Sequence, residues 1–490
     1  MTPVRRVAPV WIGTAVGGLR RASRTAGADA RRAPKPTPAA MHVLAPSPEL
    51  ITRHPDPMRR PAHRTTLPPN SPPHRWPART RAALAAVLLA AAPALAQTGP
   101  ASPARLQQAV DSVAARALGI PVEGISVAVV RGDSVLLQSA YGLADVEDGR
   151  PVTPETVFEI GSATKPFTAA AVFRLAEEGR LSLDDEVGRH LPPLRERAAG
   201  VTLRHLLSHT SGLARAWAVE DLSAPSSPQA VVDSLAARPV ESAPGERYAY
   251  NNNGFILLGL VVEAASGVPY AEYLDRTFLR PLGLASVAPC EELSAERMAR
   301  GYTHPTRGPA EAAPAPSHHP TVTFSAGALC ATAGDLARWQ RALASGRVVS
   351  PEGYQFMTTP VVPASGRPAP YGLGIEVASL DGRPSAGHGG ATPGFVVEAA
   401  YLPGDSLGVA VLTNGVYAGS VVSEMVRAVA RAALGLPQPA VEDRPLTPAE
   451  RDRFSGTYTL GEARTLEVYT QGTHLRLQPP GRQVAARLLY

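Results

Sequence analysis

The sequence of 490 residues has few cysteines and no long hydrophobic run. Its two cysteines are too few for a small fold held together by disulfides, and its 43 glycines fall far short of a collagen. Without long apolar runs, the chain is not a multi-pass membrane protein. A length of 490 residues allows two to four domains, at roughly 100–200 residues per domain.

Outside the N-terminal region the chain has no excess of positive charge. Residues 1–97 carry 15 Lys and Arg against 3 Asp and Glu, whereas the rest of the chain carries 33 against 39. The net charge of +6 therefore comes from the N-terminal region alone. An acidic body argues against nucleic acid as a partner.

The N-terminal region predicts two segments. Residues 1–75 are rich in Pro, Arg and Ala without an apolar period, which predicts a disordered basic leader. Residues 76–96 predict a secretory signal peptide, because arginines precede the apolar run Ala82–Ala92 and small residues allow cleavage after Ala96. The run is too short to span a bilayer permanently. We expect an exported protein, periplasmic or extracellular, with no permanent membrane span.

Two features leave alternatives open. The signal-like segment follows about 80 residues, which is unusual for a signal peptide, so the true start could be Met41 or Met58. A retained leader could instead bind membranes or polyanions, and the apolar run could be an ordinary Ala-rich helix. In an oxidising compartment Cys290 and Cys330 could form a disulfide, although their geometry cannot be read from the sequence.

The pattern of the body predicts strands at both ends and helices between them. Apolar residues at helical spacing open it, and Ile125–Val130 and Val135–Ser139 predict a hairpin. Helical patterns dominate from about 164 to 282, and Thr332 resembles an N-cap for a helix running to about Ala344. For residues 101–436 we expect an α+β fold, an antiparallel sheet flanked by helices with an inserted helical domain.

Strand patterns return toward the end of the chain. They lie at Gly372–Val377, Phe395–Tyr401 and Gly408–Leu412, and a final helix is predicted at Val421–Ala433. Pro437–Pro445 is predicted to be a linker. Beyond it, residues 446–490 predict a small C-terminal β module with strands at 456–460, 465–470 and 474–478. The chain stops on an apolar run, which leaves open whether this module is complete.

Lysine is the rarest cation in the sequence. Only Lys35 and Lys165 occur, and Lys165 follows Ser162 by three residues. A lysine can lose its proton when it is buried, which an arginine cannot do. Residues i and i+3 share a helix face, and the helical pattern after Ser162 predicts that both side chains meet at a helix N-terminus. A neutral Lys165 could then take the proton of the Ser162 hydroxyl.

Together with three later motifs, this pair resembles the serine β-lactamase and penicillin-binding protein superfamily. The motifs are Tyr250-Asn251-Asn252, His388-Gly389-Gly390 and the stretch from His205 to Gly212. The chain is most similar to class C β-lactamase-like serine hydrolases, which include D-alanyl-D-alanine carboxypeptidases and family VIII carboxylesterases. The resemblance covers about Val122 to Leu434 and implies the β-lactamase/DD-peptidase fold.

The resemblance also implies roles for single residues. Ser162 is the expected nucleophile, and Lys165 and Tyr250 are expected to share a proton, each lowering the pKa of the other. Asn252 is expected to hold a substrate amide. The backbone N–H groups of Ser162 and Ala391 are expected to form the oxyanion hole.

His388 and Gly390 are expected to contact substrate along a strand. Penicillin-destroying relatives commonly carry a lysine where this chain has His388, and a histidine is mostly neutral at pH 7. This difference weakens a β-lactamase assignment and favours a peptidase or an esterase. Gly390 is expected to let substrate lie against the strand.

Other motifs carry no function in this interpretation. Gly404-Asp405-Ser406-Leu407-Gly408 fits a nucleophile elbow, but a strand follows where an elbow needs a helix, which predicts a hairpin turn. His205 and His209 lack the glutamate of a zinc-protease motif, and His318-His319 lies in a Pro/Ala loop. We therefore expect no metal and no cofactor.

The predicted function is that of an exported serine hydrolase acting through an acyl-enzyme on Ser162. It would cleave a small-molecule, peptide or ester substrate as a carboxypeptidase, an esterase or a β-lactamase-like enzyme. The alternative is a non-catalytic protein of the same fold that binds peptidoglycan fragments or β-lactams. The sequence names neither the substrate nor the oligomeric state.

Overall fold

The computed structural model describes residues 20–21, 102–118, 122–216, 221–303, 312–415, 419–438, 446–460, 464–471, 474–478 and 486–488. The predicted signal peptide lies outside these residues, as does the leader apart from Arg20–Arg21. Most of the predicted linker, 439–445, also lies outside them. These predictions therefore stay predictions.

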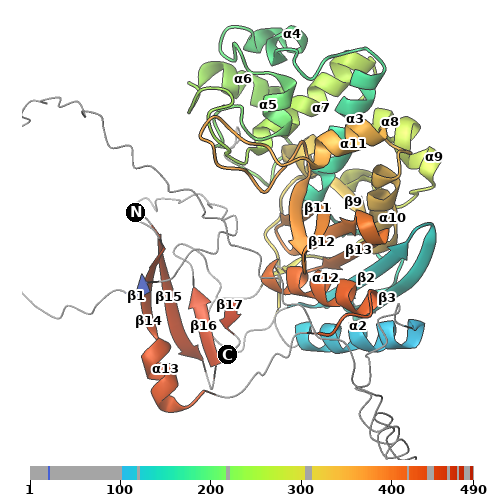
Figure 1. The fold of residues 1–490 in the computed structure, drawn as a ribbon, viewed down its shortest axis with the longest axis vertical. Coiled ribbons are helices and arrows are strands. Elements are labelled where there is room, and N and C mark those ends of the chain that lie inside the picture. The colour runs from blue at the N-terminus through green and yellow to red at the C-terminus, as the bar shows by residue number, and fades with distance from the viewer. Residues whose placement is uncertain are drawn as a thin grey trace, which may run out of the picture. The chain divides into compact units, whose positions relative to one another are not determined.

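A seven-stranded antiparallel sheet forms the centre of the main body (Figure 1), with the strand order β10-β11-β12-β13-β2-β3-β4. Both ends of the body contribute strands, and β13 pairs with β2 to join the two groups. The strands are β2 (Gly124–Arg131), β3 (Ser134–Asp145), β4 (Arg150–Pro151), β10 (Glu376–Leu380), β11 (Arg383–Thr392), β12 (Phe395–Leu402) and β13 (Leu407–Thr413). The predicted hairpin and the α+β arrangement are confirmed.

Each face of the sheet has its own apolar core. Along β2, Ile125, Val127 and Val129 pack under the helices α2 (Pro103–Ala117) and α12 (Gly419–Ala433). Ala128 and Val130 on the same strand belong to the other core, which includes α10, the helix predicted after Thr332 and observed at 333–344. This alternation follows from the two-residue period of a strand.

The inserted region is mainly helical and lies beyond one end of the sheet (Figure 1). Its helix α7 is apolar on nearly all sides and buried, as expected for the central helix of such a domain. Its helices are α3 (Lys165–Glu177), α4 (Val187–His190), α5 (Leu203–Leu207), α6 (Gln229–Ala237), α7 (Asn252–Ser266), α8 (Tyr270–Leu274) and α9 (Arg280–Leu282). No single helix in the described part of the chain is long and apolar enough to cross a membrane, and one bent helix pair passes that test by composition.

A small three-stranded sheet contains a disulfide. It consists of β5 (Phe158–Glu159), β9 (Leu329–Ala331) and β6 (Ala288–Pro289). The pairing of β6 with β9 brings Cys290 and Cys330 together, and their Cα atoms lie 5.1 Å apart in the disulfide. The pairing that the sequence left open is therefore present.

The C-terminal module is an antiparallel sheet with one helix. It contains α13 (Pro448–Phe454), β14 (Gly456–Leu460), β15 (Arg464–Gln471), β16 (His474–Gln478) and β17 (Ala486–Leu488). The three predicted strands are confirmed, and β1 (Arg20–Arg21) pairs with β14.

Of two regions near β10 and β12, the sequence predicted the first incorrectly and the second correctly. The strand expected at Gly372–Val377 begins only at Glu376, because Gly374 adopts φ +85° and its backbone packs against Ala169. The turn predicted at Gly404 is confirmed, with Ser406 at φ +48° between β12 and β13.

Candidate active site

Ser162 lies on a single 3₁₀ turn, Gly161–Thr164, directly before α3. The helix expected after Ser162 begins at Lys165. Residues i and i+3 eclipse each other in a 3₁₀ turn, so the two side chains stack more closely than on an α-helix. Lys165 Nζ lies 3.0 Å from Ser162 Oγ.

Lys165 is fully buried and has three hydrogen-bond partners. Besides Ser162 Oγ, its Nζ lies 2.9 Å from Asn252 Oδ1 and 2.8 Å from the carbonyl oxygen of Ala326. Burial lowers the pKa of the Lys165 amine well below its usual value, and the carboxylate of Glu376 opposes this shift. The amine can therefore lose its proton much more readily than an exposed lysine.

The three partners of Lys165 determine where the two N–H groups and the lone pair of its neutral amine would point. Such an amine has two N–H donors and one lone pair. The Asn252 amide oxygen and the Ala326 carbonyl can only accept, so they take both N–H groups. The lone pair then faces the Ser162 hydroxyl, which can donate to it. This is the arrangement that a general base for Ser162 requires.

Tyr250 lies two residues before α7 and close to Ser162. Its hydroxyl shares a hydrogen bond with Ser162, and Lys165 Nζ lies 4.9 Å from the centre of its ring. Burial raises the pKa of Tyr250 well above its usual value. The expectation that Lys165 and Tyr250 lower each other's pKa is thus wrong for Tyr250. The phenol stays protonated and can relay a proton, while Lys165 accepts one.

Asn252 is the first residue of α7, and its amide oxygen accepts the hydrogen bond from Lys165. The sequence predicted a contact between Asn252 and a substrate amide. The amide oxygen holds the lysine in place, and the contact with substrate stays a prediction.

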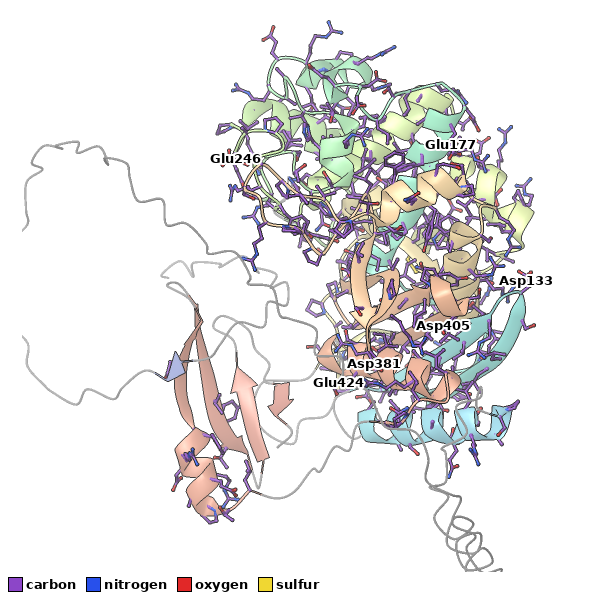
Figure 2. The ribbon with its side chains drawn as sticks, in the orientation of Figure 1. Asp133, Glu177, Glu246, Asp381, Asp405 and Glu424 are labelled. Atoms are coloured by element: carbon purple, nitrogen blue, oxygen red, sulfur yellow. A yellow bond between two sulfur atoms is a disulfide. The ribbon has the colours of Figure 1, made fainter. Side chains whose placement is uncertain are left out.

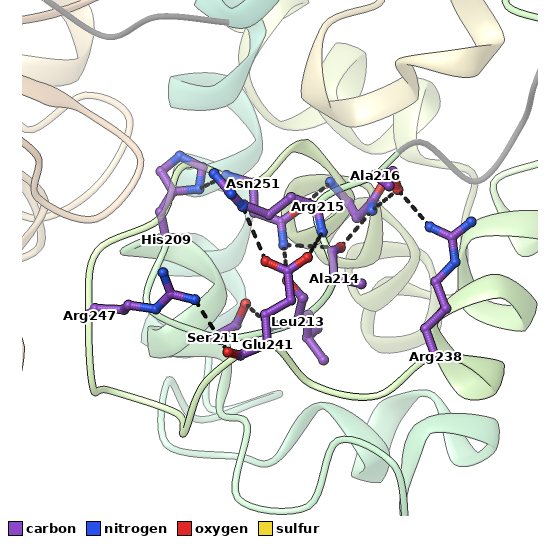
Figure 3. A network of polar contacts seen from close by, with 11 residues as sticks. His209, Ser211, Leu213, Ala214, Arg215, Ala216, Arg238, Glu241, Arg247 and Asn251 are labelled. Atoms are coloured by element: carbon purple, nitrogen blue, oxygen red, sulfur yellow. Dashed lines mark hydrogen bonds and ion pairs between the residues drawn. The ribbon is translucent and has the colours of Figure 1, made fainter. Parts of the chain in front are cut away.

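The loop from Ser208 to Ala216 holds the start of α7, as Figure 3 shows. His209 Nδ1 accepts a hydrogen bond from the backbone N–H of Asn251, and the Asn251 side chain donates to the carbonyl oxygen of Leu213. The His209 ring also packs 4.2 Å from the Tyr250 ring, centre to centre. The stretch from His205 to Gly212, one of the family motifs named above, thus positions Tyr250. His205 itself caps α5 through Thr202.

The strand β11 packs directly against the Ser162 turn. A Cβ atom at Gly390 would lie 1.9 Å from the carbonyl oxygen of Ile160, and one at Gly161 would lie 2.9 Å from the backbone nitrogen of Ala391. Gly390 is therefore required by the close approach of two backbones. The expectation that its small size also lets substrate lie against the strand stays a prediction. The backbone nitrogen of Ala391 lies beside the Ser162 turn, where the oxyanion hole was expected.

His388 is buried, with 1% of its side chain exposed. Its Nε2 lies 2.9 Å from the hydroxyl of Tyr371, and burial lowers its pKa to about 3. The ring is therefore neutral, as expected. The expectation that this side chain contacts substrate stays a prediction.

Sequence reasoning missed three residues of this site: Ala326, Tyr371 and Glu376. Ala326 acts through its backbone carbonyl, which no side-chain motif can reveal. Tyr371 and Glu376 flank a Gly-rich turn that was interpreted as strand. His318, set aside above, lies 3.5 Å from Glu159 Oε2, outside this cluster.

Three comparisons relate the chain to known proteins. Residues 110–434 match the Beta-lactamase family. D-aminopeptidase from Gluconobacter oxydans (strain 621H) is 32% identical over 347 residues, which cover 68% of this chain and 62% of that protein. Penicillin-binding protein 4* from Bacillus subtilis (strain 168) is 27% identical over 384 residues, which cover 73% of this chain and 84% of the relative.

A solved structure shows a similar fold. D-amino acid amidase from Ochrobactrum anthropi SV3, complexed with D-phenylalanine, superposes with a TM-score of 0.60 at 25% identity and covers 67% of this chain and 98% of that one. The chain spans less than two thirds of the length of the D-aminopeptidase. Because the family match covers most of the chain and includes the Ser162, Tyr250 and His388 motifs, this protein belongs to the Beta-lactamase family.

Proposed function

We propose that this protein is an exported serine hydrolase that cleaves amides of D-amino acids through an acyl-enzyme on Ser162. The observation that carries the proposal is the buried amine of Lys165, whose Nζ lies 3.0 Å from Ser162 Oγ. A protein that only binds peptidoglycan fragments or β-lactams needs no such proton acceptor. The names of the D-aminopeptidase and the D-amino acid amidase support the choice of substrate class.

The proposed reaction begins with transfer of the Ser162 hydroxyl proton to Lys165 Nζ. The Ser162 oxygen then attacks the amide carbon, and the backbone N–H groups of Ser162 and Ala391 stabilise the oxyanion, at about 3 kcal/mol per donor. Tyr250 relays the proton from Lys165 to the departing amine. Attack by water on the acyl-enzyme releases the acid and restores Ser162.

The choice among family activities rests on charge. A β-lactam or a peptide with a free C-terminus brings a carboxylate, which a cation near the strand would hold. His388 is neutral and buried in this position. The site therefore lacks this cation at His388, which favours an uncharged or cationic substrate over an anionic one.

Mass spectrometry of the full chain tests the proposal. The protein is mixed separately with a D-amino acid p-nitrophenyl ester, a D-amino acid amide and benzylpenicillin. We expect an acyl adduct on Ser162 from the ester and hydrolysis of the amide. Both should be lost in Ser162→Ala and kept in Ser345→Ala, which removes an exposed serine at the end of α10. Equal reaction of Ser162→Ala would refute the nucleophile, and reaction with benzylpenicillin alone would refute the substrate class.

Export is the second part of the proposal. The signal-like segment supports it, as does the Cys290–Cys330 disulfide, because disulfides persist in oxidising compartments. Expression in a bacterial host followed by intact-mass analysis of the periplasmic fraction should give a chain that begins near Gln97. An uncleaved chain retained in the cytoplasm would contradict export without affecting the chemistry at Ser162.

A further inference from the structure

Glu376 is an acidic residue beside the active-site strand. Its Oε2 accepts a hydrogen bond of 3.3 Å from the backbone N–H of Gly389, and its Oε1 lies 3.8 Å from His388 Nδ1. Half of its side chain, 49%, is open to solvent. The carboxylate is therefore held against β11 and can still reach a ligand.

The position of Glu376 in the sheet explains what it can reach. It is the first residue of β10, and the pairing of β10 with β11 ends where Glu376 faces Gly387. Residues 388–392 of β11 continue past that point and run alongside the Ser162 turn. A substrate that adds to this edge as an extra strand meets the Glu376 carboxylate at one end and Ser162 further along.

Burial raises the pKa of the Glu376 carboxyl to about 7, and the hydrogen bond from Gly389 and the charge of Lys165 oppose this shift, so the group is a carboxylate above about that pH. Lys165 from α3 and His388 from β11 are both buried, and burial lowers the pKa of each. The negative charge of Glu376 also raises the pKa of three nearby tyrosines and so helps to keep them protonated: Tyr248, Tyr250 and Tyr371. Glu398 on β12 is a further acidic neighbour. When Glu376 is ionised, the electrostatic potential at this end of the site is therefore negative.

We propose that Glu376 binds the protonated amino group of the substrate and so selects amides with a free amino terminus over N-acylated and anionic ones. The inference rests on the proposed function of Ser162. An ammonium group supplies three donors to a carboxylate acceptor. A neutral N-acetyl group loses this charged contact, and a carboxylate in the same place is repelled.

The test uses three p-nitroanilides of alanine, in both enantiomers, with a free amine, an N-acetyl group or an N-succinyl group. They share a leaving group and differ in charge. For the full chain we expect kcat/KM to fall from the amine to the acetyl to the succinyl substrate. In Glu376→Gln the ratio of kcat/KM for the free-amine substrate to that for the N-acetyl substrate should fall roughly tenfold. This is the loss expected for a charged hydrogen bond that is partly screened by solvent. Glu424→Gln, an exposed change on α12 (Figure 2), should keep the wild-type ratio.

A binding measurement covers the case of slow turnover. Alaninamide should slow the labelling of Ser162 by a fluorophosphonate more strongly than N-acetylalaninamide does, and Glu376→Gln should remove this difference. An unchanged ratio and unchanged protection in Glu376→Gln would overturn the proposal, as would an equal loss on all three substrates. If the fluorophosphonate fails to label Ser162 in the wild type, the proposed function fails instead.

Discussion

Lys165 Nζ and Ser162 Oγ lie 3.0 Å apart, and the lysine has no exposed surface. The two other partners of the amine are acceptors only, so a neutral lysine would turn its lone pair toward the serine. The most direct predictions concern this contact and the groups that maintain it.

Lys165→Arg should abolish turnover, because a guanidinium cannot give up its proton at any working pH. Because an arginine side chain is larger than the buried lysine it replaces, Lys165→Met is a second variant. Methionine has a volume similar to that of lysine and no charge. Both should lose acylation of Ser162, measured by mass spectrometry, while circular dichroism checks the fold. Acylation at the wild-type rate in a folded variant would exclude Lys165 as the proton acceptor.

Tyr250→Phe should slow acylation by about 10²–10⁴-fold, the range for a lost proton-transfer group. The phenol shares a hydrogen bond with Ser162, and the phenylalanine keeps its packing against His209. Single-turnover kinetics with an activated ester would measure the step. Tyr248→Phe is the matched control and should stay close to the wild type. If Tyr248→Phe shows the larger loss, the roles of the two tyrosines must be exchanged.

Gly390→Ala should displace the Ser162 turn, because its Cβ would lie 1.9 Å from the carbonyl oxygen of Ile160. We expect a loss of about 1–3 kcal/mol of stability or more, together with slower fluorophosphonate labelling. Gly389→Ala is the control for stability, since its Cβ meets nothing closer than 3.7 Å. Equal melting temperatures for the two variants would show that β11 tolerates a side chain at 390.

The Cys290–Cys330 disulfide should contribute about 4 kcal/mol to stability, as expected from a closed loop with a sequence separation of 40. Replacing both cysteines by alanine should lower the melting temperature. A reducing agent should do the same to the wild type and should leave the double variant unchanged. A wild type that melts at the same temperature with and without reductant would argue against this contribution.

Glu159 should make the protein less stable as the pH rises from about 4.5 to 7. Its side chain is only 17% exposed, and burial raises its pKa from 4.5 to about 7. The native state therefore binds a proton that the unfolded state has released in this range, so the free energy of unfolding falls as the pH rises through it. His318 does not cancel the charge of Glu159, because burial lowers the pKa of the histidine and so favours its neutral form.

Glu159→Gln cannot ionise, so it should gain stability relative to the wild type, on the order of 2 kcal/mol, between pH 4.5 and 7.5. Urea unfolding at a series of pH values measures this gain, with Glu424→Gln as the exposed control. Parallel stability curves for Glu159→Gln and the wild type would mean that Glu159 ionises as freely in the native state as in the unfolded one.

The sequence by itself determined what depends on neighbours along the chain. The period of two along β2 and β13, the hairpin at Gly132 and the turn at Ser406 were all predictable, because local backbone preferences and alternation decide them. The spacing of Ser162 and Lys165 belongs to the same class, since three residues bring two side chains together on any helical turn.

Only the tertiary structure decided the chemical state of these groups. Lys165 is buried and hydrogen-bonded to Ala326, which lies more than 150 residues further along the chain. The neutral, inaccessible ring of His388 likewise depends on distant segments. The need for glycine at 390 and the position of Glu376 beside the strand likewise come from packing between distant segments. Burial and electrostatic fields sum over everything that surrounds a group in space, and the order of residues in a chain does not reveal those neighbours.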